Sequence, residues 1–168
     1  MKIKRISLAL VVTALMLTLS GWLIAQSTVR ESEESDSQLE GSWNTVVGPG
    51  SPIEFRTLVS YAEGGAMMAT EPAFPPPFHG STVHGTWEKT GRHQFASTFL
   101  CLIYDPTGHF VGTLKVRENI TLNRAGNEYN QVSSQEVFDP AGNPVPQFST
   151  CNTAHGTRIN VEPVIPCP

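Results

Sequence analysis

Apolar and polar side chains alternate between Phe110 and Leu122, and this is the clearest pattern in the chain. A period of two places successive residues on opposite faces of an extended strand. One face carries Phe110, Gly112, Leu114, Val116, Ile120 and Leu122, and the other carries Val111, Thr113, Lys115, Arg117, Asn119 and Thr121. The pattern predicts an antiparallel strand with one buried face and one face in water.

Similar patterns recur along the chain between turn sequences. Strands are expected at about 40–47, 52–61, 64–70, 82–89, 93–104, 109–123, 127–138 and 145–161, the last broken near Gly156. Two turns, at 105–108 and 139–142, share the sequence Asp-Pro-x-Gly, in which Pro fixes φ and Gly permits a positive φ. Eight strands of ~10 residues with connectors of ~5 need about 115 residues, close to the length of 39–162. The expected fold is all-β, an antiparallel up-and-down eight-stranded β-barrel.

The connector at 71–80 differs from the others because it holds four prolines. Each proline removes a donor from a strand ladder, so a central strand is excluded here. Phe74 and Phe78 give the connector apolar anchors. Two interpretations stay open, a stiff lid across the mouth of the barrel or an ordered surface loop packed against an edge, and the second is preferred.

The N-terminus has the pattern of an export signal. Lys2, Lys4 and Arg5 precede an apolar run from Ile6 to Ile24, and Ala25 supplies the small side chain expected at a cleavage site. Residues 1–25 are therefore predicted to be a signal peptide of a secreted or periplasmic protein. The run approaches the ~18 to 20 residues that span a bilayer, so an uncleaved anchor is the alternative.

The rest of the chain divides by composition. Residues 26–38 are rich in Ser, Glu and Asp and predict a flexible acidic spacer, 39–162 form the barrel domain, and 163–168 are a tail containing Pro and Cys. A length of 168 residues suits one domain, and a net charge of −4 argues against a nucleic-acid partner. No stable membrane association is expected once the signal is cleaved, and the oligomeric state is not defined by the sequence.

Three cysteines would lie in an oxidising compartment. A disulfide between Cys151 and Cys167 would tie the tail to the last strand, with a contribution of ~3 kcal/mol for a loop of roughly 15 residues. Cys101 would then be a small buried side chain within an apolar run. The alternative pairs Cys101 with Cys151 across two strands.

The triplet Gly41-Ser42-Trp43, followed by a strand meander and by Arg158 on the last strand, resembles the lipocalin and wider calycin pattern. In that family the tryptophan plugs one end of an up-and-down barrel and a basic residue lies across its indole. The resemblance implies this role for Trp43 and Arg158, with a cation–π contribution of ~0.5 to 2 kcal/mol. The run at 85–91, with Val116-Arg117-Glu118 downstream, also looks like small secreted bacterial proteins with a lipocalin-like or allene-oxide-cyclase-like barrel. Such a resemblance implies a fold without an established chemistry.

Glu118 is the most notable candidate for chemistry. Strict alternation places it on the face of Val116 and Ile120, so it would project into the barrel with a raised pKa and serve as acid, base or ligand hook. The alternative is a bulge between Val116 and Ile120 that turns Glu118 outward beside Arg117 or Lys115.

Metal and nucleophile chemistry have little support in the sequence. The five histidines lack zinc-ligand spacing, and only a convergence of His84, His93 and His155 across strands would make a site, so no metal or cofactor is expected. No nucleophile elbow is present in the sequence either.

The interior of the barrel is therefore the candidate site. Its predicted ligand-binding residues are Phe55, Tyr61, Phe95, Phe99, Leu114 and Glu118. The preferred function is binding of a small apolar molecule, and whether the protein is an enzyme stays open. The alternatives are an isomerase or cyclase in which Glu118, with His84 or Tyr104, moves a proton, and a structural barrel filled by its own side chains. A cavity of a few hundred Å³ would count against the structural barrel, and an ionisable pair inside it would favour the enzyme.

Overall fold

The computed structural model describes residues 38–70, 74 and 76–165. The described chain forms strands joined by short turns, with single 3-10 turns at Glu63–Gly65 (η1) and Pro146–Phe148 (η2). The strands are β1 (Gly41–Val47), β2 (Phe55–Tyr61), β3 (Ala66–Ala69), β4 (His79–Gly80), β5 (Val83–Gly91), β6 (Gln94–Tyr104), β7 (Phe110–Leu122), β8 (Glu128–Phe138) and β9 (Thr150–Arg158). The predicted signal peptide and nearly all of the predicted spacer lie outside the described residues. Within them, no helix has the length and apolar character needed to span a membrane.

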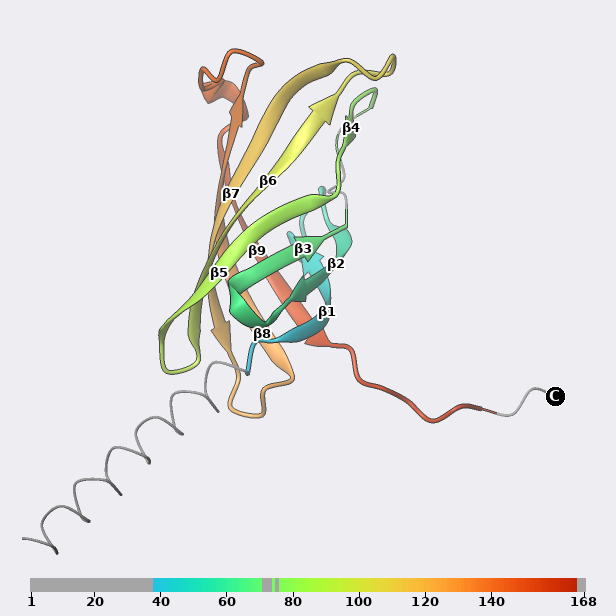
Figure 1. The fold of residues 1–168 in the computed structure, drawn as a ribbon, viewed down its shortest axis with the longest axis vertical. Helices are drawn as coiled ribbons and strands as arrows, with labels where there is room; N and C mark the ends of the chain where they lie inside the picture. Colours follow the sequence, from blue (N-terminus) through green and yellow to red (C-terminus); the bar gives the residue numbers. More distant parts are fainter. Residues whose placement is uncertain (1–37, 71–73, 75, 166–168) are drawn as a thin grey trace, which may run out of the picture. The chain divides into compact units, whose positions relative to one another are not determined.

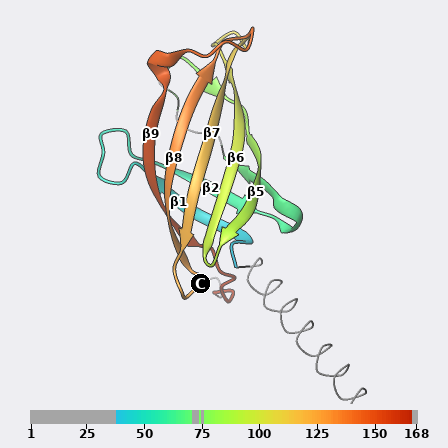
Figure 2. The same ribbon diagram turned by 90° about the vertical axis from the view of Figure 1, so that its left-hand side faces the viewer.

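The strands close into an eight-stranded, all-antiparallel β-barrel, as predicted. Each strand of the ring pairs with the next one in sequence, in the order β1-β2-β3-β5-β6-β7-β8-β9, and β9 pairs back with β1. Figure 1 shows this ring, and Figure 2 shows β5 to β9 side by side along one wall. The two-residue strand β4 pairs with the end of β6 at Ile103 and Tyr104, beyond the part of β6 that pairs with β5.

The last strand differs most from its prediction. The expected strand at 145–161 begins only at Thr150, because Pro146 starts η2 instead of a ladder. The predicted break at Gly156 is wrong, since Gly156 lies inside β9. A Cβ at this position would overlap the ring of Tyr129, so the missing side chain provides space for an aromatic neighbour.

The alternation along β7 is present with one exception. From Gly112 to Leu122 every second residue is buried. Phe110, predicted to face inward, is 42% exposed and packs against Tyr104 with ring centroids 6.3 Å apart. The register passes from Ile103 opposite Gly112 to Tyr104 opposite Phe110, so Val111 is an extra residue at this point. A bulge of this kind reverses the facing of the residues beyond it.

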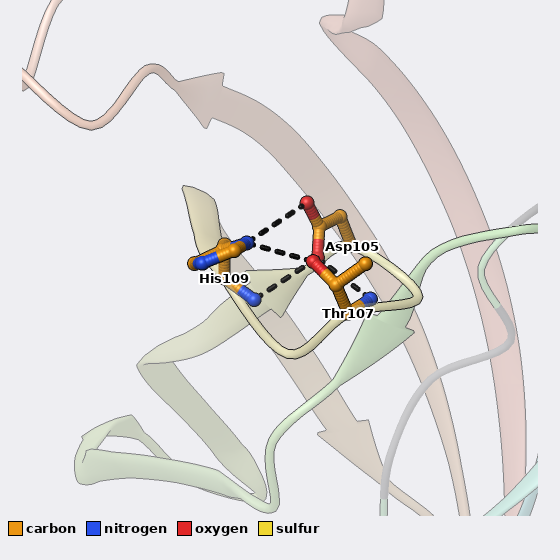
Figure 3. A network of polar contacts seen from close by, with 3 residues as sticks. All are labelled: Asp105, Thr107 and His109. Atoms are coloured by element: carbon orange, nitrogen blue, oxygen red, sulfur yellow. Dashed lines mark hydrogen bonds and ion pairs between the residues drawn. The ribbon is translucent and has the colours of Figure 1, made fainter.

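The two turns with the Asp-Pro-x-Gly sequence are built in the same way. In the turn from β6 to β7, Asp105 Oδ1 accepts hydrogen bonds from the amides of Thr107 and His109 at 2.9 and 3.0 Å and from the Thr107 hydroxyl at 2.6 Å (Figure 3). The hydrogen bond from the Thr107 side chain is the main reason why the pKa of Asp105 is lowered. Asp139 accepts from the amides two and four residues later at 2.9 and 2.8 Å. These short, well-bonded turns explain why the meander is regular.

One end of the barrel is filled by aromatic rings. The cluster consists of Trp43, Tyr61, Trp87, Phe95 and Tyr129, all of them buried. Trp43 packs on Tyr129 with centroids 4.9 Å apart, and Trp87 lies 5.8 Å from Phe95 and 6.0 Å from Tyr61. The indole N–H of Trp43 donates to the Leu39 carbonyl at 3.0 Å, so this polar atom is satisfied inside the core.

Arg158 closes this filled end from outside. Its Cζ lies 4.3 Å from the centroid of the Trp43 ring, within cation–π range. The guanidinium donates to the carbonyls of Gly126 at 2.7 Å, of Glu40 at 2.6 Å and of Gln38. The last strand is thereby bonded to the residues that lead into the first.

Candidate functional site

The half of the barrel opposite Trp43 encloses a cavity of about 830 Å³. All eight strands of the ring contribute to its wall, together with the loops at that end. Its apolar lining consists of Val47, Phe55, Val59, Met67, Ala69, Phe74, Val83, Phe99, Ile103, Val111, Leu114, Val116, Val137, Phe138 and Val145. Ile53, Phe78 and Phe148 also line the cavity and are 65%, 43% and 61% exposed, which marks this end as its mouth.

The boundary between the filled and the hollow half can be followed along single strands. On β7, Leu114 and Val116 line the cavity, whereas Ile120 and Leu122, buried on the same face, do not. Large rings occupy the interior at one end, and mostly aliphatic side chains leave space at the other, as the small diameter of an eight-stranded barrel requires. Glu118, between Val116 and Ile120 on this face, lies at the boundary between the two halves.

Glu118 points into the barrel and is only 8% exposed. Its neighbours directly across the sheet are Ser97 on β6 and Ser133 on β8, and between Val116 and Ile120 the pairing runs without interruption on both sides. The alternative of an outward-turning bulge is therefore excluded. The carboxylate accepts hydrogen bonds from the Ser97 hydroxyl and from the side-chain amide of Gln131.

Burial controls the charge of Glu118. Removal from water raises the pKa of this carboxyl to about 7, although the hydrogen bonds from Ser97 and Gln131 act in the opposite direction. Near neutral pH the group therefore exists in comparable amounts with and without its proton. A carboxyl of this kind, at the floor of an apolar cavity, is a typical feature of binding and catalytic sites.

Two buried tyrosines lie close to Glu118 on the side of the filled end. The Tyr129 hydroxyl is hydrogen-bonded to Thr45 Oγ1 at 2.6 Å, and the Tyr61 hydroxyl is buried beside it. Burial raises the pKa of both hydroxyls, and the charge of Glu118 raises them further. Both tyrosines are therefore neutral at neutral pH.

The structure places the six predicted ligand-binding residues in two groups. Phe55, Phe99, Leu114 and Glu118 line the cavity. Tyr61 and Phe95 do not line it, since both rings belong to the aromatic cluster of the filled end. All six side chains face the interior, but they lie at different depths along the barrel axis.

Polar residues of the cavity floor were missed by the sequence analysis. Thr45, Gln131 and Ser133 are buried and line the cavity, and buried Ser97 bonds to Glu118 from β6. One signal in the sequence could have found two of them: the alternation of β8 places Gln131 and Ser133 on the same face as Tyr129. Polar side chains on that face are typical of a solvated surface, and only the closed barrel turns the face inward.

The predicted proton-transfer partners of Glu118 are not at the site. His84 is exposed on the outside of β5, and Tyr104 packs on Phe110 at the end of β6; neither lines the cavity. No group of three His, Cys, Asp or Glu residues in the described ranges could hold a metal ion, so the considered convergence of His84, His93 and His155 does not occur there.

The proline-rich connector contributes to the mouth of the cavity. Phe74 and Phe78 line the cavity, and β4 at its end pairs with β6, which agrees with a loop packed against an edge. Residues 71–73 and 75 of the connector lie outside the described residues.

The described cysteines do not pair with each other. Cys101 is buried and its thiol donates to the Ser81 carbonyl at 3.2 Å, whereas Cys151 is exposed on β9. The alternative disulfide between Cys101 and Cys151 is therefore wrong. Cys167 lies outside the described residues, and its pairing with Cys151 stays a prediction.

Comparisons with models of protein families, with curated proteins and with solved structures found no match to this chain. What the chain shares with lipocalins is the closed eight-stranded antiparallel barrel.

Proposed function

We propose that this protein binds a small, largely apolar molecule inside its barrel, as a secreted or periplasmic lipocalin-like carrier. The observation that carries the proposal is the cavity of about 830 Å³, with an apolar wall and a small polar group at its floor. This volume is within the ~300 to 1,000 Å³ typical of small-molecule sites, which combine apolar walls with a few polar groups.

The cavity argues against a purely structural barrel. Protein interiors are close-packed and hold few voids larger than a water molecule, and a barrel of this size can be filled by its own side chains. The other half of the same barrel is filled in this way, with Trp43 completely buried. The hollow half is thus a local departure from close packing, which is what a binding site requires.

Export is supported by the basic residues Lys2, Lys4 and Arg5 and by the apolar run that follows them. Apolar molecules dissolve poorly in the water outside the cytoplasm. A carrier there would hold such molecules inside its barrel.

Two measurements test the binding function. Native mass spectrometry of the protein from its own host is expected to show a co-purifying small molecule. Titration of stripped protein with the neutral apolar dye N-phenyl-1-naphthylamine is expected to give saturable fluorescence at one dye per barrel. Absence of both the co-purifying mass and saturable dye binding would contradict the proposal.

A second candidate is an isomerase or cyclase, and one observation favours it: Glu118 has a pKa of about 7 inside an apolar cavity, which suits an acid or base catalyst. The hydrogen-bond partners of Glu118 in the described structure, Ser97 and Gln131, do not ionise, so the pair expected of such an enzyme is not formed there. Binding is therefore preferred. Recovery of the bound molecule in a rearranged form, with the rearrangement lost in Glu118→Gln, would favour the enzyme instead.

A further inference from the structure

We infer that the molecule bound in the barrel is a cationic amphiphile, an apolar body whose inner end is a protonated amine that pairs with Glu118. The inference rests on the proposed binding function and assigns the chemical class of the ligand. It excludes carboxylic acids such as fatty acids as the preferred ligand.

The charges around the cavity are all of one sign. Three acidic residues line it in the described structure, Glu118 at the floor and Glu54 and Asp139 near the mouth, and none of the lining residues described is Lys or Arg. A carboxylate ligand would meet no opposite charge on its way in and a like charge at the floor, and like charges repel strongly where water is excluded. An ammonium group would find a partner of opposite charge at the deepest point.

The hydrogen-bonding groups at the floor also favour a donor. Each carboxylate oxygen of Glu118 accepts one hydrogen bond, from Ser97 or from Gln131, and an ionised carboxylate oxygen can accept more than one. Since the Gln131 amide donates to Glu118, its carbonyl oxygen is left as a further acceptor at the cavity wall. An ammonium group has three N–H donors and no acceptor, so it matches such a floor.

The groups that face Glu118 from the neighbouring strands are neutral. They are Ser97 from β6, Gln131, Ser133 and Tyr129 from β8, and Tyr61 from β2. Glu118 therefore has no cation beside it in the described structure, and a bound ammonium would supply the missing charge. Because an ammonium pairs best with the ionised carboxyl, amine binding should strengthen as Glu118 loses its proton.

The test uses the full-length protein and three competitors of equal chain length. Dodecylamine, dodecanol and dodecanoic acid each displace N-phenyl-1-naphthylamine at pH 5.5 and at pH 8. The expected order of affinity at pH 8 is amine, then alcohol, then acid, and the amine should bind roughly tenfold more tightly at pH 8 than at pH 5.5.

Variants locate the effect. Glu118→Gln should weaken the amine by about tenfold to a hundredfold and remove its pH dependence, while the alcohol changes by less than about threefold. Glu88→Gln makes the same change of charge on the exposed outer side of β5 and should leave the order and affinities unchanged. Dye binding by each variant shows that its barrel is folded. The comparison of amine affinity at the two pH values uses the wild type alone, so it tests the proposal even if a variant does not fold.

The outcomes separate the two proposals. Dye that binds without saturation, together with the absence of a co-purifying small molecule, would refute the binding function itself. Saturable dye that dodecanoic acid displaces as well as or better than dodecylamine would overturn the cationic ligand and leave the binding function standing. An amine affinity that Glu118→Gln does not lower would overturn the pairing in the same way.

Discussion

At the scale of single residues, Glu118 is a buried carboxyl whose ionised form is destabilised by the fold. Its carboxyl is 8% exposed and its hydrogen bonds come from neutral side chains. Taking a carboxylate out of water costs free energy that such hydrogen bonds only partly offset, so the folded protein favours the protonated form. A residue that costs stability in this way is more easily explained by a ligand than by packing.

This cost should be measurable as a dependence of stability on pH. The pKa of Glu118 is raised to about 7 in the folded protein from roughly 4.3 in the unfolded chain. Between these values the folded state keeps a proton that the unfolded state has lost, so the free energy of unfolding falls as pH rises, and the loss is complete above pH 7. From pH 5 to pH 8 the wild type should lose about 2 kcal/mol more than Glu118→Gln.

Urea denaturation followed by tryptophan fluorescence at the two pH values provides this measurement. Glu118→Gln is the control for the other titrating groups of the wild type, because only the difference between the two proteins is compared. Equal losses in wild type and Glu118→Gln would mean that the carboxyl is not buried as described.

At the scale of elements, β9 shows how one strand fits another. Gly156 faces the ring of Tyr129, which pairs with it across the sheet. Gly156→Ala would place a methyl group into this ring, and overpacking of this kind costs about 1 to 3 kcal/mol. The free energy of unfolding should therefore fall by that amount.

Gly91→Ala is the matched control. The atoms nearest to a Cβ at Gly91 belong to the flexible side chain of Gln94. Chemical denaturation should show little change for this variant, and equal destabilisation of the two variants would contradict the packing of Tyr129 against β9.

Strand positions were predictable because alternation and turn chemistry are local. The exceptions depend on partners far away in the sequence. Gly156 looks like a break until Tyr129 is placed beside it, and Phe110 looks buried until the bulge opposite Tyr104 turns it outward. Neither partner can be identified from the periodicity of a single strand.

The candidate site was predictable in direction but not in depth. Alternation indicates which side chains face inward, and it does so correctly for Phe99 and Phe95 alike. It does not indicate that Phe99 lines the cavity while Phe95 fills the closed end, because depth depends on how the strands tilt around the barrel. The inward-facing Gln131 was missed for a related reason, since a polar side chain is ordinarily assigned to the solvent.

At the scale of the whole molecule, the barrel combines a packed half with a hollow half, and a matched pair of substitutions on β7 can distinguish them. Val116 lines the cavity, and Ile120, four residues further along the same buried face, does not. Val116→Phe adds a ring to open space and should change the free energy of unfolding by less than about 1 kcal/mol, whereas Ile120→Phe should lower it by about 1 to 3 kcal/mol.

Binding should change in the opposite sense. Val116→Phe should weaken N-phenyl-1-naphthylamine because its ring takes up cavity volume, and Ile120→Phe should bind the dye normally under conditions where it is folded. Denaturation curves and dye titrations of both variants check this. If protein side chains filled the cavity in solution, Val116→Phe would destabilise the protein strongly.

The contacts of Arg158 have a consequence for the order of the strands. Its guanidinium bonds to the carbonyls of Gln38 and Glu40, and the amide of Ile159 donates to the Ser42 carbonyl at 2.8 Å. The residue before β1 and the residue after β9 are therefore close together in space. Every other connection of the ring joins strands that are adjacent in it. A circularly permuted chain, with residue 159 linked to residue 38 and new termini in the turn after Tyr104, would keep every pairing of the ring, so the strand that comes first in the sequence is interchangeable.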